Sequence, residues 1–346
     1  MVASLYSPAE ENKEIWVFLE QEEGILQPVS LELMGKGRQM ADDMGWPLCG
    51  LLLGDQVAPL AEQAFTLGAD RVWLAEHPLL EHFTIDAYAR VAFQALNEGK
   101  PSIFLLGATP DGRDLAARLA VRLRTGLNAD CTDLRIDPAE GVLVSEVSGF
   151  GGGVLALIEM HQHRPQMATV RPGVFQVGKA REVHEAHAGR TGKIIRVPVE
   201  LTADMIHTRI VERHTSAGVD LTHAPVLVAG GRGVGADFSE LKKLAAVLNG
   251  EVGATRPPVD LGYIERERQV GQTGVACSPK LAICWGISGA FHFVVGIEKA
   301  DTVIAINLDP EAPIFDYADY CIVADAHKVL PVLIQALQSD AELSHE

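Results

Sequence analysis

The sequence predicts an α/β protein of two domains, each with a parallel sheet flanked by helices. With 346 residues, the chain is longer than one hydrophobic core usually serves. Strand-length apolar runs alternate with segments of helical length, which is the pattern of βαβ units. Apolar residues make up 47% of the chain, and its 33 glycines predict many tight turns.

The N-terminal domain is expected to span residues 1–200. Its strands are expected at Ile15–Leu19, Pro47–Leu53, Arg71–Ala75 and Ser102–Gly107, and its helices at Val29–Met44, Val57–Leu67, Thr84–Asn97 and Arg113–Arg124. Four shorter β runs follow at Thr132–Ile136, Val142–Val147, Val154–Glu159 and Gln166–Val170. We expect these runs to extend the sheet or to add an antiparallel edge.

A charged segment that contains several histidines, residues 178–201, is interpreted as the linker to a second domain over residues 201–346. The second domain is expected to be Rossmann-like. Its best-marked helix follows Asp237, which is placed to cap it. Its strands are expected at Val226–Gly230, Lys280–Trp285, Thr302–Ile306 and Tyr320–Val323, and its helices at Phe238–Leu248, Ala290–Gly296 and His327–Leu337.

Charge and composition argue against several classes of protein. The formal net charge is −17, and no cluster of Lys and Arg is present, so a nucleic-acid partner is not expected. No apolar stretch approaches the roughly 20 residues that span a bilayer. The N-terminus is too acidic for a transit peptide and lacks the apolar core of a signal peptide. We therefore expect a cytoplasmic protein without direct membrane insertion.

The cysteines and histidines do not form a recognisable reactive site. Five cysteines without CxxC spacing predict buried free thiols, because zinc and iron–sulfur sites need closely spaced ligands. No Ser/His/Asp or Cys/His nucleophile set can be assembled. The sequence therefore predicts no catalytic residue and no metal ligand, and any chemistry would belong to a bound cofactor.

A series of Gly-rich turns occupies the second domain, most of them where a strand is expected to lead into a helix. Such turns allow a phosphate to approach the backbone at the carboxyl edge of a parallel sheet. Polar residues at their tips suggest a large phosphate-bearing cofactor with a ring. The turns are Gly230–Gly235, Gly253–Arg256, Gln269–Gly274, Trp285–Ala290, Asn307–Pro310 and Ala324–Asp325.

Each turn taken alone leaves two interpretations open. Arg232 could pair with a phosphate in a bidentate manner, or it could be a surface Arg in a flexible loop. Arg256 could lie over an aromatic ring, or it could belong to a rigid connector before two prolines. The turn at Gln269–Gly274 could offer amide and hydroxyl groups to a heteroaromatic edge, or it could be an ordinary turn.

The order of these motifs resembles the α subunit of electron transfer flavoproteins. The matching stretches are GGRGVG, VGATR, QVGQTG, GISGA and AINLDPEAPIFDYADYCIVAD, which lie between residues 230 and 325. GATPDGRDLAARLAVRLRTGLNADCTDL (residues 107–134) and HRPQMATVRPGVF (residues 163–175) are similar to its N-terminal domain. The resemblance covers nearly the whole chain after about residue 14 and implies one FAD in the C-terminal domain and a β-subunit partner.

The resemblance also implies which residues contact the FAD. Contacts with the phosphates are implied for Arg232, Ser288, Gly289 and Ala290, and contacts with the flavin for Thr255, Arg256, Val270, Gly271, Gln272 and Thr273. Arg256 is implied over the ring and Thr273 near its N5. The ribityl–adenosine part is assigned to Asn307, Asp325 and Ala326, and the helix start Phe291, His292 and Phe293 completes the set.

One departure from the family pattern concerns this helix start. The family usually reads SGAIQH where this chain reads SGAFHF, so Phe293 stands where a His is expected near the flavin C2 carbonyl, and His292 takes the Gln position. Successive helical residues point about 100° apart, so His292 is not expected to replace that His. An apolar ring stabilises negative charge on the reduced flavin less than an imidazole does, which favours two-electron transfer or a lower potential. Compensation by a backbone N–H group, Arg256 or the β subunit is the alternative.

The resemblance implies an electron carrier subunit with its redox chemistry at FAD, and whether it acts as an enzyme stays open. The chain would move electrons from flavin dehydrogenases, such as the acyl-CoA dehydrogenase type, to a quinone oxidoreductase or to ferredoxin. A variant in which the partner subunit binds a second flavin and NADH stays open at this point. So does a subunit of the same fold that binds a nucleotide for assembly or regulation and no longer cycles electrons.

Overall fold

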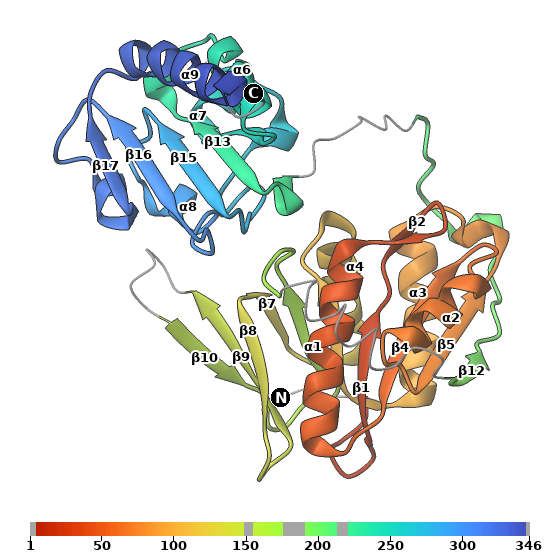
Figure 1. The fold of residues 1–346 in the computed structure, drawn as a ribbon. Coiled ribbons are helices and arrows are strands. Elements are labelled where there is room, and N and C mark those ends of the chain that lie inside the picture. Colours follow the sequence, from red (N-terminus) through yellow and green to blue (C-terminus); the bar gives the residue numbers. More distant parts are fainter. Residues whose placement is uncertain (1–4, 149–154, 176–190, 213–220, 344–346) are drawn as a thin grey trace. The chain divides into compact units, whose positions relative to one another are not determined.

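The computed structural model describes residues 5–148, 155–175, 191–212 and 221–343. The chain forms two compact units, residues 1–213 and residues 214–346 (Figure 1). Each unit contains its own parallel sheet with helices packed on it, which confirms the α/β fold predicted from the sequence. The part of the expected linker that covers residues 178–190 lies outside the described residues, as does Val154.

The first unit is built on a seven-stranded sheet whose paired strands all run parallel. Its central strand β1 lies between β4 and β6, and most of the sheet's residues are buried. In spatial order the strands are β12 (Lys193–Arg196), β5 (Arg71–Glu76), β4 (Leu48–Gly54), β1 (Asn12–Phe18), β6 (Pro101–Gly107), β11 (Gln166–Val170) and β7 (Leu127–Cys131).

Helices cover both faces of this sheet because each buries one apolar stripe. Residues of α1 (Pro28–Met44) and α2 (Ala58–Thr66) form one apolar cluster with the sheet, and residues of α3 (Ile85–Gly99) and α4 (Pro110–Leu123) form another. Helix α1 ends at Gly45, which is left-handed with φ 65° and donates its N–H to carbonyls of the last turn. A short 3₁₀ turn, η1 (Pro78–Leu80), precedes α3.

The four short β runs divide between two sheets. β8 (Asp133–Asp137), β9 (Val142–Ser148) and β10 (Leu155–Glu159) form a separate antiparallel sheet, whereas Gln166–Val170 joins the parallel sheet as β11. A small hairpin joins β2 (Gln21–Glu22) to β3 (Ile25–Leu26). The linker interpretation is wrong for Lys193–Arg196, because these residues pair with β5 as an edge strand. Exposed charges at both ends of that strand hid it in the sequence.

The second unit has a five-stranded parallel sheet in the order β14-β13-β15-β16-β17. The strands are β13 (Val226–Gly230), β14 (Glu251–Ala254), β15 (Leu281–Trp285), β16 (Val303–Asn307) and β17 (Tyr320–Val323). Strand β14 was not predicted. Its four residues include Gly253 and Ala254, which carry little β propensity.

The helices of the second unit are long on one face of the sheet and short on the other. α6 (Ser239–Val247) and α9 (Ala326–Leu343) pack with one apolar cluster, and α8 (Phe291–Val294) with the opposite one. Helix α6 starts one residue later than predicted, yet the Asp237 carboxylate accepts the Ser239 N–H at 2.8 Å. The remaining elements of this unit are α7 (Arg256–Asp260), η3 (Leu221–His223), η4 (Arg232–Val234), η5 (Arg266–Arg268) and η6 (Pro313–Tyr317), whereas η2 (Ala203–Met205) belongs to the first unit.

None of the described helices is both long enough and apolar enough to cross a bilayer.

Candidate functional site

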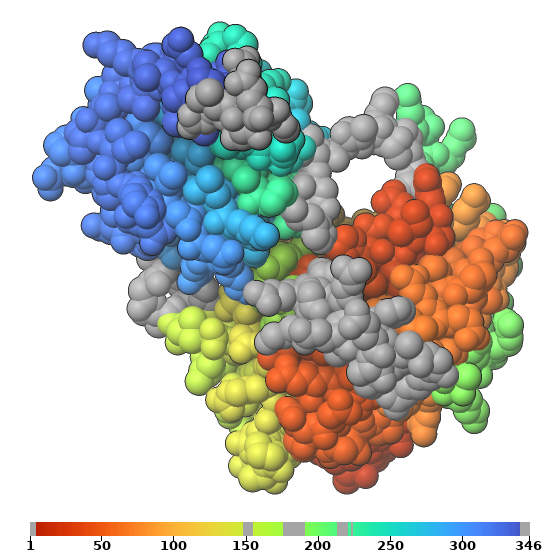
Figure 2. Space-filling model, in the orientation of Figure 1, coloured from red at the N-terminus to blue at the C-terminus, as the bar shows by residue number. Residues whose placement is uncertain are grey.

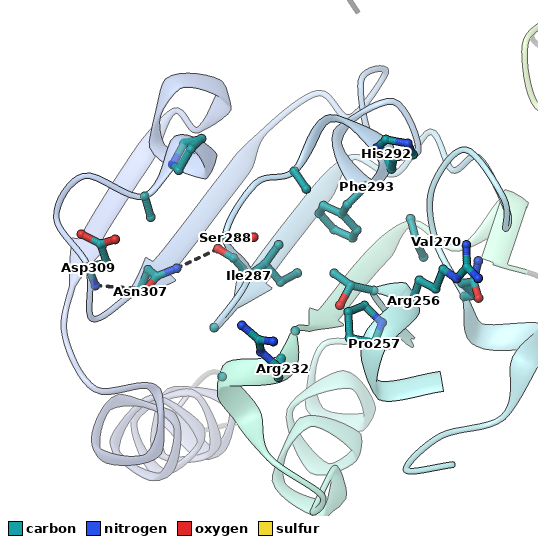
Figure 3. Close-up of a pocket in the computed structure, with 18 of the residues that line it drawn as sticks. Arg232, Arg256, Pro257, Val270, Ile287, Ser288, His292, Phe293, Asn307 and Asp309 are labelled. Carbon is teal, nitrogen blue, oxygen red and sulfur yellow. Dashed lines mark hydrogen bonds between the residues drawn. The ribbon is translucent and has the colours of Figure 1, made fainter. Parts of the chain in front are cut away.

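A pocket of about 540 Å³ lies at the carboxyl ends of β13 and β15 in the second unit (Figure 3). The chain passes from β13 to β14 on one side and then returns to β15 on the other, so this is the topological switch point of the sheet. The volume is in the range of ligand pockets. The lining residues are Gly231, Arg232, Gly233, Thr255, Arg256, Pro257, Gln269, Val270, Thr273, Gly286, Ile287, Ser288, Ala290, His292, Phe293, Asn307, Asp309, Ala312 and Pro313.

Glycines at the floor of the pocket let two turns pack backbone against backbone. The Gly231 N–H donates to the Trp285 carbonyl at 2.8 Å, and the Gly233 N–H donates to the Gly286 carbonyl at 3.1 Å. A Cβ at Gly233 would lie 2.9 Å from the Gly286 Cα, and Gly286 itself has φ 58°. These two N–H groups are therefore engaged within the protein, and the glycines act by allowing the close approach.

Two arginines give the pocket positive charge from different turns. Arg232 is exposed in η4 and makes no ion pair within the described part of the chain. Arg256 begins α7, and its Nε donates to the Asp260 carboxylate at 3.0 Å. Arg232 is thus the better placed of the two for an anionic ligand, while Arg256 shares its charge with a neighbour one turn away.

The loop between residues 269 and 275 is fastened to the start of α8. The Gln272 N–H donates to the His292 carbonyl at 2.6 Å, and the Gln269 side chain donates to the Thr273 hydroxyl at 2.9 Å. Gly271 has φ 130°, and a Cβ there would overlap the His292 carbonyl oxygen. The polar tip of this loop is therefore held in one position against α8.

Phe293 and His292 both line the pocket, but in different surroundings. Phe293 is only 4% exposed and belongs to an apolar cluster with Val270 and Ile287. His292 is exposed. Figure 3 shows the Phe293 ring directed inward between the segments that carry Ile287 and Val270. The wall next to this ring is apolar and suits an uncharged aromatic face.

The end of the pocket at β16 is polar. The Asn307 side-chain amide donates to the Ile287 carbonyl at 2.8 Å, and its oxygen accepts the Asp309 N–H at 3.1 Å. The first bond ties the end of β16 to the turn after β15, and the second lies within the turn after β16 (Figure 3). The carboxylate of Asp309 is thereby placed at the pocket edge opposite the apolar wall.

The structure brings most of the predicted residues to this pocket. Arg232, Thr255, Arg256, Val270, Thr273, Ser288, Ala290, His292, Phe293 and Asn307 line it. Gly271, Gln272 and Gly289 lie in the same turns and Phe291 begins α8, but none of the four is among the lining residues. Asp325 and Ala326 lie where α9 begins, and α9 contacts η4. The Asp325 carboxylate accepts the His327 N–H at 3.0 Å, so it caps this helix.

Several lining residues were missed by the sequence reasoning. Asp309, Ala312 and Pro313 follow the Asn307 turn, which was recognised, although only its first residue was assigned. Pro257 and Gln269 each adjoin an assigned residue, and Gln269 is buried. The residues at the turn tips could be recognised in the sequence, because glycine and polar side chains mark them. The neighbouring apolar and buried positions look the same in the sequence as ordinary packing residues.

The expectation of buried thiols holds for four of the cysteines and is wrong for the fifth. Cys49, Cys131, Cys277 and Cys284 are buried, whereas Cys321 is exposed on β17. Burial raises the pKa of the Cys284 thiol to about 12, so this group stays neutral in the core of the second unit. The described residues contain no group of His, Cys, Asp and Glu side chains arranged to hold a metal ion.

The pocket fits a cofactor that carries both an aromatic ring and phosphates. Phe293, Val270 and Ile287 supply an apolar wall, Arg232 supplies a cation without an ion-pair partner within the described residues, and Ser288 and Thr255 supply hydroxyl groups. Ser288 lies in the turn after β15, and Asn307 ends β16 at the same edge of the sheet. This set of side chains suits a nucleotide cofactor with an aromatic ring better than a metal or a purely apolar ligand.

Comparison with known proteins agrees with this geometry. Residues 15–202 match the electron transfer flavoprotein domain, and residues 220–298 match the electron transfer flavoprotein FAD-binding domain. The chain is 45% identical to the electron transfer flavoprotein subunit alpha of Clostridium acetobutylicum, covering 94% of this chain and 97% of the relative. It is 43% identical to the subunit of the same name from Thermoanaerobacterium thermosaccharolyticum, covering 94% and 98%.

A similar match is found to a protein with another name. Protein FixB of Clostridium saccharobutylicum is 46% identical, covering 93% of this chain and 95% of the relative. The pocket, the matched domains and the long alignments lead to one conclusion: the chain belongs to the electron transfer flavoprotein family as an alpha subunit, and its cofactor is FAD.

Proposed function

We propose that this chain pairs with an electron transfer flavoprotein β subunit and carries electrons from flavin dehydrogenases of the acyl-CoA dehydrogenase type to a quinone- or ferredoxin-linked carrier. The observation that supports this most is the pocket lined together by Arg232, by Gln269, Val270 and Thr273 of the loop at residues 269–275, and by Phe293. Cation, polar loop and apolar ring meet there at the switch point of the sheet.

Different residues of the pocket would contact different parts of the cofactor. When bound, FAD accepts and releases the electrons, and the protein supplies binding and environment. Arg232 and Ser288 would hold the phosphates, and Asn307 the ribityl–adenosine part. Val270 and Phe293 would exclude water from the ring, while Thr273 at the tip of its loop would offer a hydroxyl to the ring edge. The bond between Gln272 and His292 would keep that loop in place.

We also propose that Phe293 lowers the potential of the bound flavin. The ring is buried in an apolar cluster and offers no hydrogen-bond donor to negative charge on the reduced cofactor. Phe293→His should therefore raise the midpoint potential, while Phe293→Leu should leave it nearly unchanged. Potentials of the two variants measured by spectroelectrochemistry test this. A histidine variant that matches the leucine variant would contradict the role of residue 293.

Reduction of the purified complex with its β subunit tests the proposed function. The complex is expected to show a flavin spectrum that bleaches on adding a reduced flavin dehydrogenase and recovers with a quinone-linked or ferredoxin-linked acceptor. A flavin that binds but is not reduced by any dehydrogenase would favour an assembly or regulatory subunit. A complex without bound flavin would contradict the proposal altogether.

A further inference from the structure

An ion pair joins the two ends of helix α7. The Arg256 Nε donates to the Asp260 carboxylate at 3.0 Å. Arg256 lines the pocket of the second unit, whereas Asp260 is not among the lining residues. Figure 3 shows the Arg256 side chain reaching toward the segment that carries Val270. A carboxylate outside the lining is therefore in contact with one of the cations of the pocket.

The backbone of α7 holds these two residues one turn apart on the same face of the helix. Pro257 and Pro258 lie in its first turn, where a proline fits because its ring fixes φ and the missing N–H would have no partner within the helix. Just before the helix, the Thr255 N–H donates to the Gly230 carbonyl at 3.0 Å. The turn is therefore stiff and anchored to the end of β13, so the two charged side chains are held within reach of each other.

Among the described residues, Asp260 is the only ion-pair partner of Arg256. Arg268, which follows in η5, contacts Glu251 and Glu265 instead, each at 3.4 Å. A guanidinium carries five N–H donors in a planar fork, and Asp260 engages the one at Nε. The N–H groups of the Nη atoms make no bond within the described part of the chain, so they are available to a ligand in the pocket.

Both side chains of the pair are exposed, Arg256 by 66% and Asp260 by 55%. In Figure 2 the turquoise part of the chain, near residue 250, reaches the surface of the second unit. An exposed ion pair is weak, because water screens its charges and both long side chains lose rotamer freedom. Negative charge that develops in the pocket can therefore compete with Asp260 for the guanidinium.

From these observations we propose that Asp260 is a positioning residue that lowers the potential of the bound flavin through Arg256. Its carboxylate holds the guanidinium by Nε and offsets part of the positive charge. Arg256 then stabilises negative charge on the reduced flavin less than an unpaired arginine would. This inference rests on the proposed function, in which the flavin ring lies in the pocket beside Val270 and Phe293.

Asp260→Asn tests this role in the complex with the β subunit. The ratio of the affinities for reduced and oxidised FAD should rise by about fivefold, at the low end for coupled sites because both side chains are exposed. A tenfold change in this ratio is about 30 mV for a two-electron couple, so the midpoint potential should rise by about 20 mV. Asp260→Glu keeps the charge and should leave the potential nearly unchanged. Spectroelectrochemistry measures both, and an unchanged potential in Asp260→Asn would overturn the proposal.

A double-mutant cycle shows whether Asp260 acts through Arg256 or directly on the ring. In an Arg256→Gln background, Asp260→Asn should change the potential much less, because the cation that the carboxylate offsets is gone. Glu267→Gln is the matched control, since Glu267 is exposed in η5, lies outside the pocket and loses the same charge. An equal rise in both backgrounds, or an equal rise in Glu267→Gln, would contradict the positioning role.

Flavin content separates this inference from the proposed function. An unaltered complex that holds no FAD, or whose FAD no dehydrogenase reduces, would be a failure of the proposed function. An unaltered complex that is reduced normally, with a potential that does not respond to Asp260→Asn, would be a failure of this inference alone. Loss of FAD from Asp260→Asn but not from Asp260→Glu would also contradict it, because an unpaired Arg256 should not weaken the binding of an anionic cofactor.

Discussion

At the scale of single residues, Arg232 is the side chain to which we assign the phosphate end of the site. It is exposed in η4 without an ion-pair partner within the described residues, whereas Arg256 already pairs with Asp260. The sequence placed both arginines at Gly-rich turns and could not distinguish them. The distinction depends on Asp260, which comes within reach only because α7 brings residues four apart together.

Replacing Arg232 by Gln should weaken FAD binding by about tenfold or more, because a charge-assisted contact with phosphate is lost. Arg266→Gln is the matched control, since Arg266 is exposed in η5 and lies outside the pocket. Fluorescence titration of the full chain with FAD measures both. If the two substitutions reduce the affinity equally, Arg232 has no specific role.

A second residue-scale prediction concerns Glu20 in the first unit. Burial raises the pKa of its carboxyl to about 7, although the Thr109 hydroxyl donates to it at 2.8 Å. The folded state therefore holds a proton that the unfolded chain loses near the ordinary value of 4.5. Stability of the first unit should fall as the pH rises from about 4.5 to about 7, by up to about 3 kcal/mol.

The Glu20→Gln variant provides the check on this pH dependence. It keeps a polar side chain near Thr109 and removes the titration. Urea unfolding at pH 5 and pH 8 should show a smaller loss of stability across this range for the variant than for the unaltered chain. An identical pH dependence of both proteins would exclude Glu20 as its source.

At the scale of elements, most strands and helices could be predicted from the pattern of apolar residues in the sequence. The central strands β1, β4, β6, β13, β15 and β16 were predicted because each is an apolar run. Strands β7, β12 and β14 were not predicted: β7 directly precedes the run expected at Thr132–Ile136, β12 lies in a charged segment, and β14 is short and rich in small residues. These strands are stabilised by pairing with strands that are distant in the sequence, and such pairing cannot be predicted from a local sequence pattern.

The loop at residues 269–275 depends on Gly271. Gly271→Ala should destabilise the second unit by about 3 kcal/mol or more, because a Cβ would overlap the His292 carbonyl oxygen at φ 130°. Gly262→Ala is the control, with φ 73° and open space around a Cβ, and should cost about 1 kcal/mol. Thermal unfolding with and without FAD measures both. Equal costs would show that α8 does not constrain the loop.

At the scale of the whole molecule, two units share an α/β design. The pocket at the switch point, with a cation, hydroxyl groups and an apolar wall, lies in the second unit. The sequence anticipated the two α/β units and the Gly-rich turns of the site. It could not anticipate that Gly231 and Gly233 serve backbone packing, because that role depends on Gly286 more than fifty residues away.

The pocket of the second unit is the site to which we assign one FAD. The most direct measurement is the FAD content per chain of the complex with its β subunit, determined by absorbance after denaturation, for the unaltered chain and for Arg232→Gln and Gly271→Ala. We predict one FAD attributable to this chain in the unaltered protein and marked loss in both variants after dialysis. Full retention of flavin in both variants, or its absence from the unaltered complex, would contradict the claim.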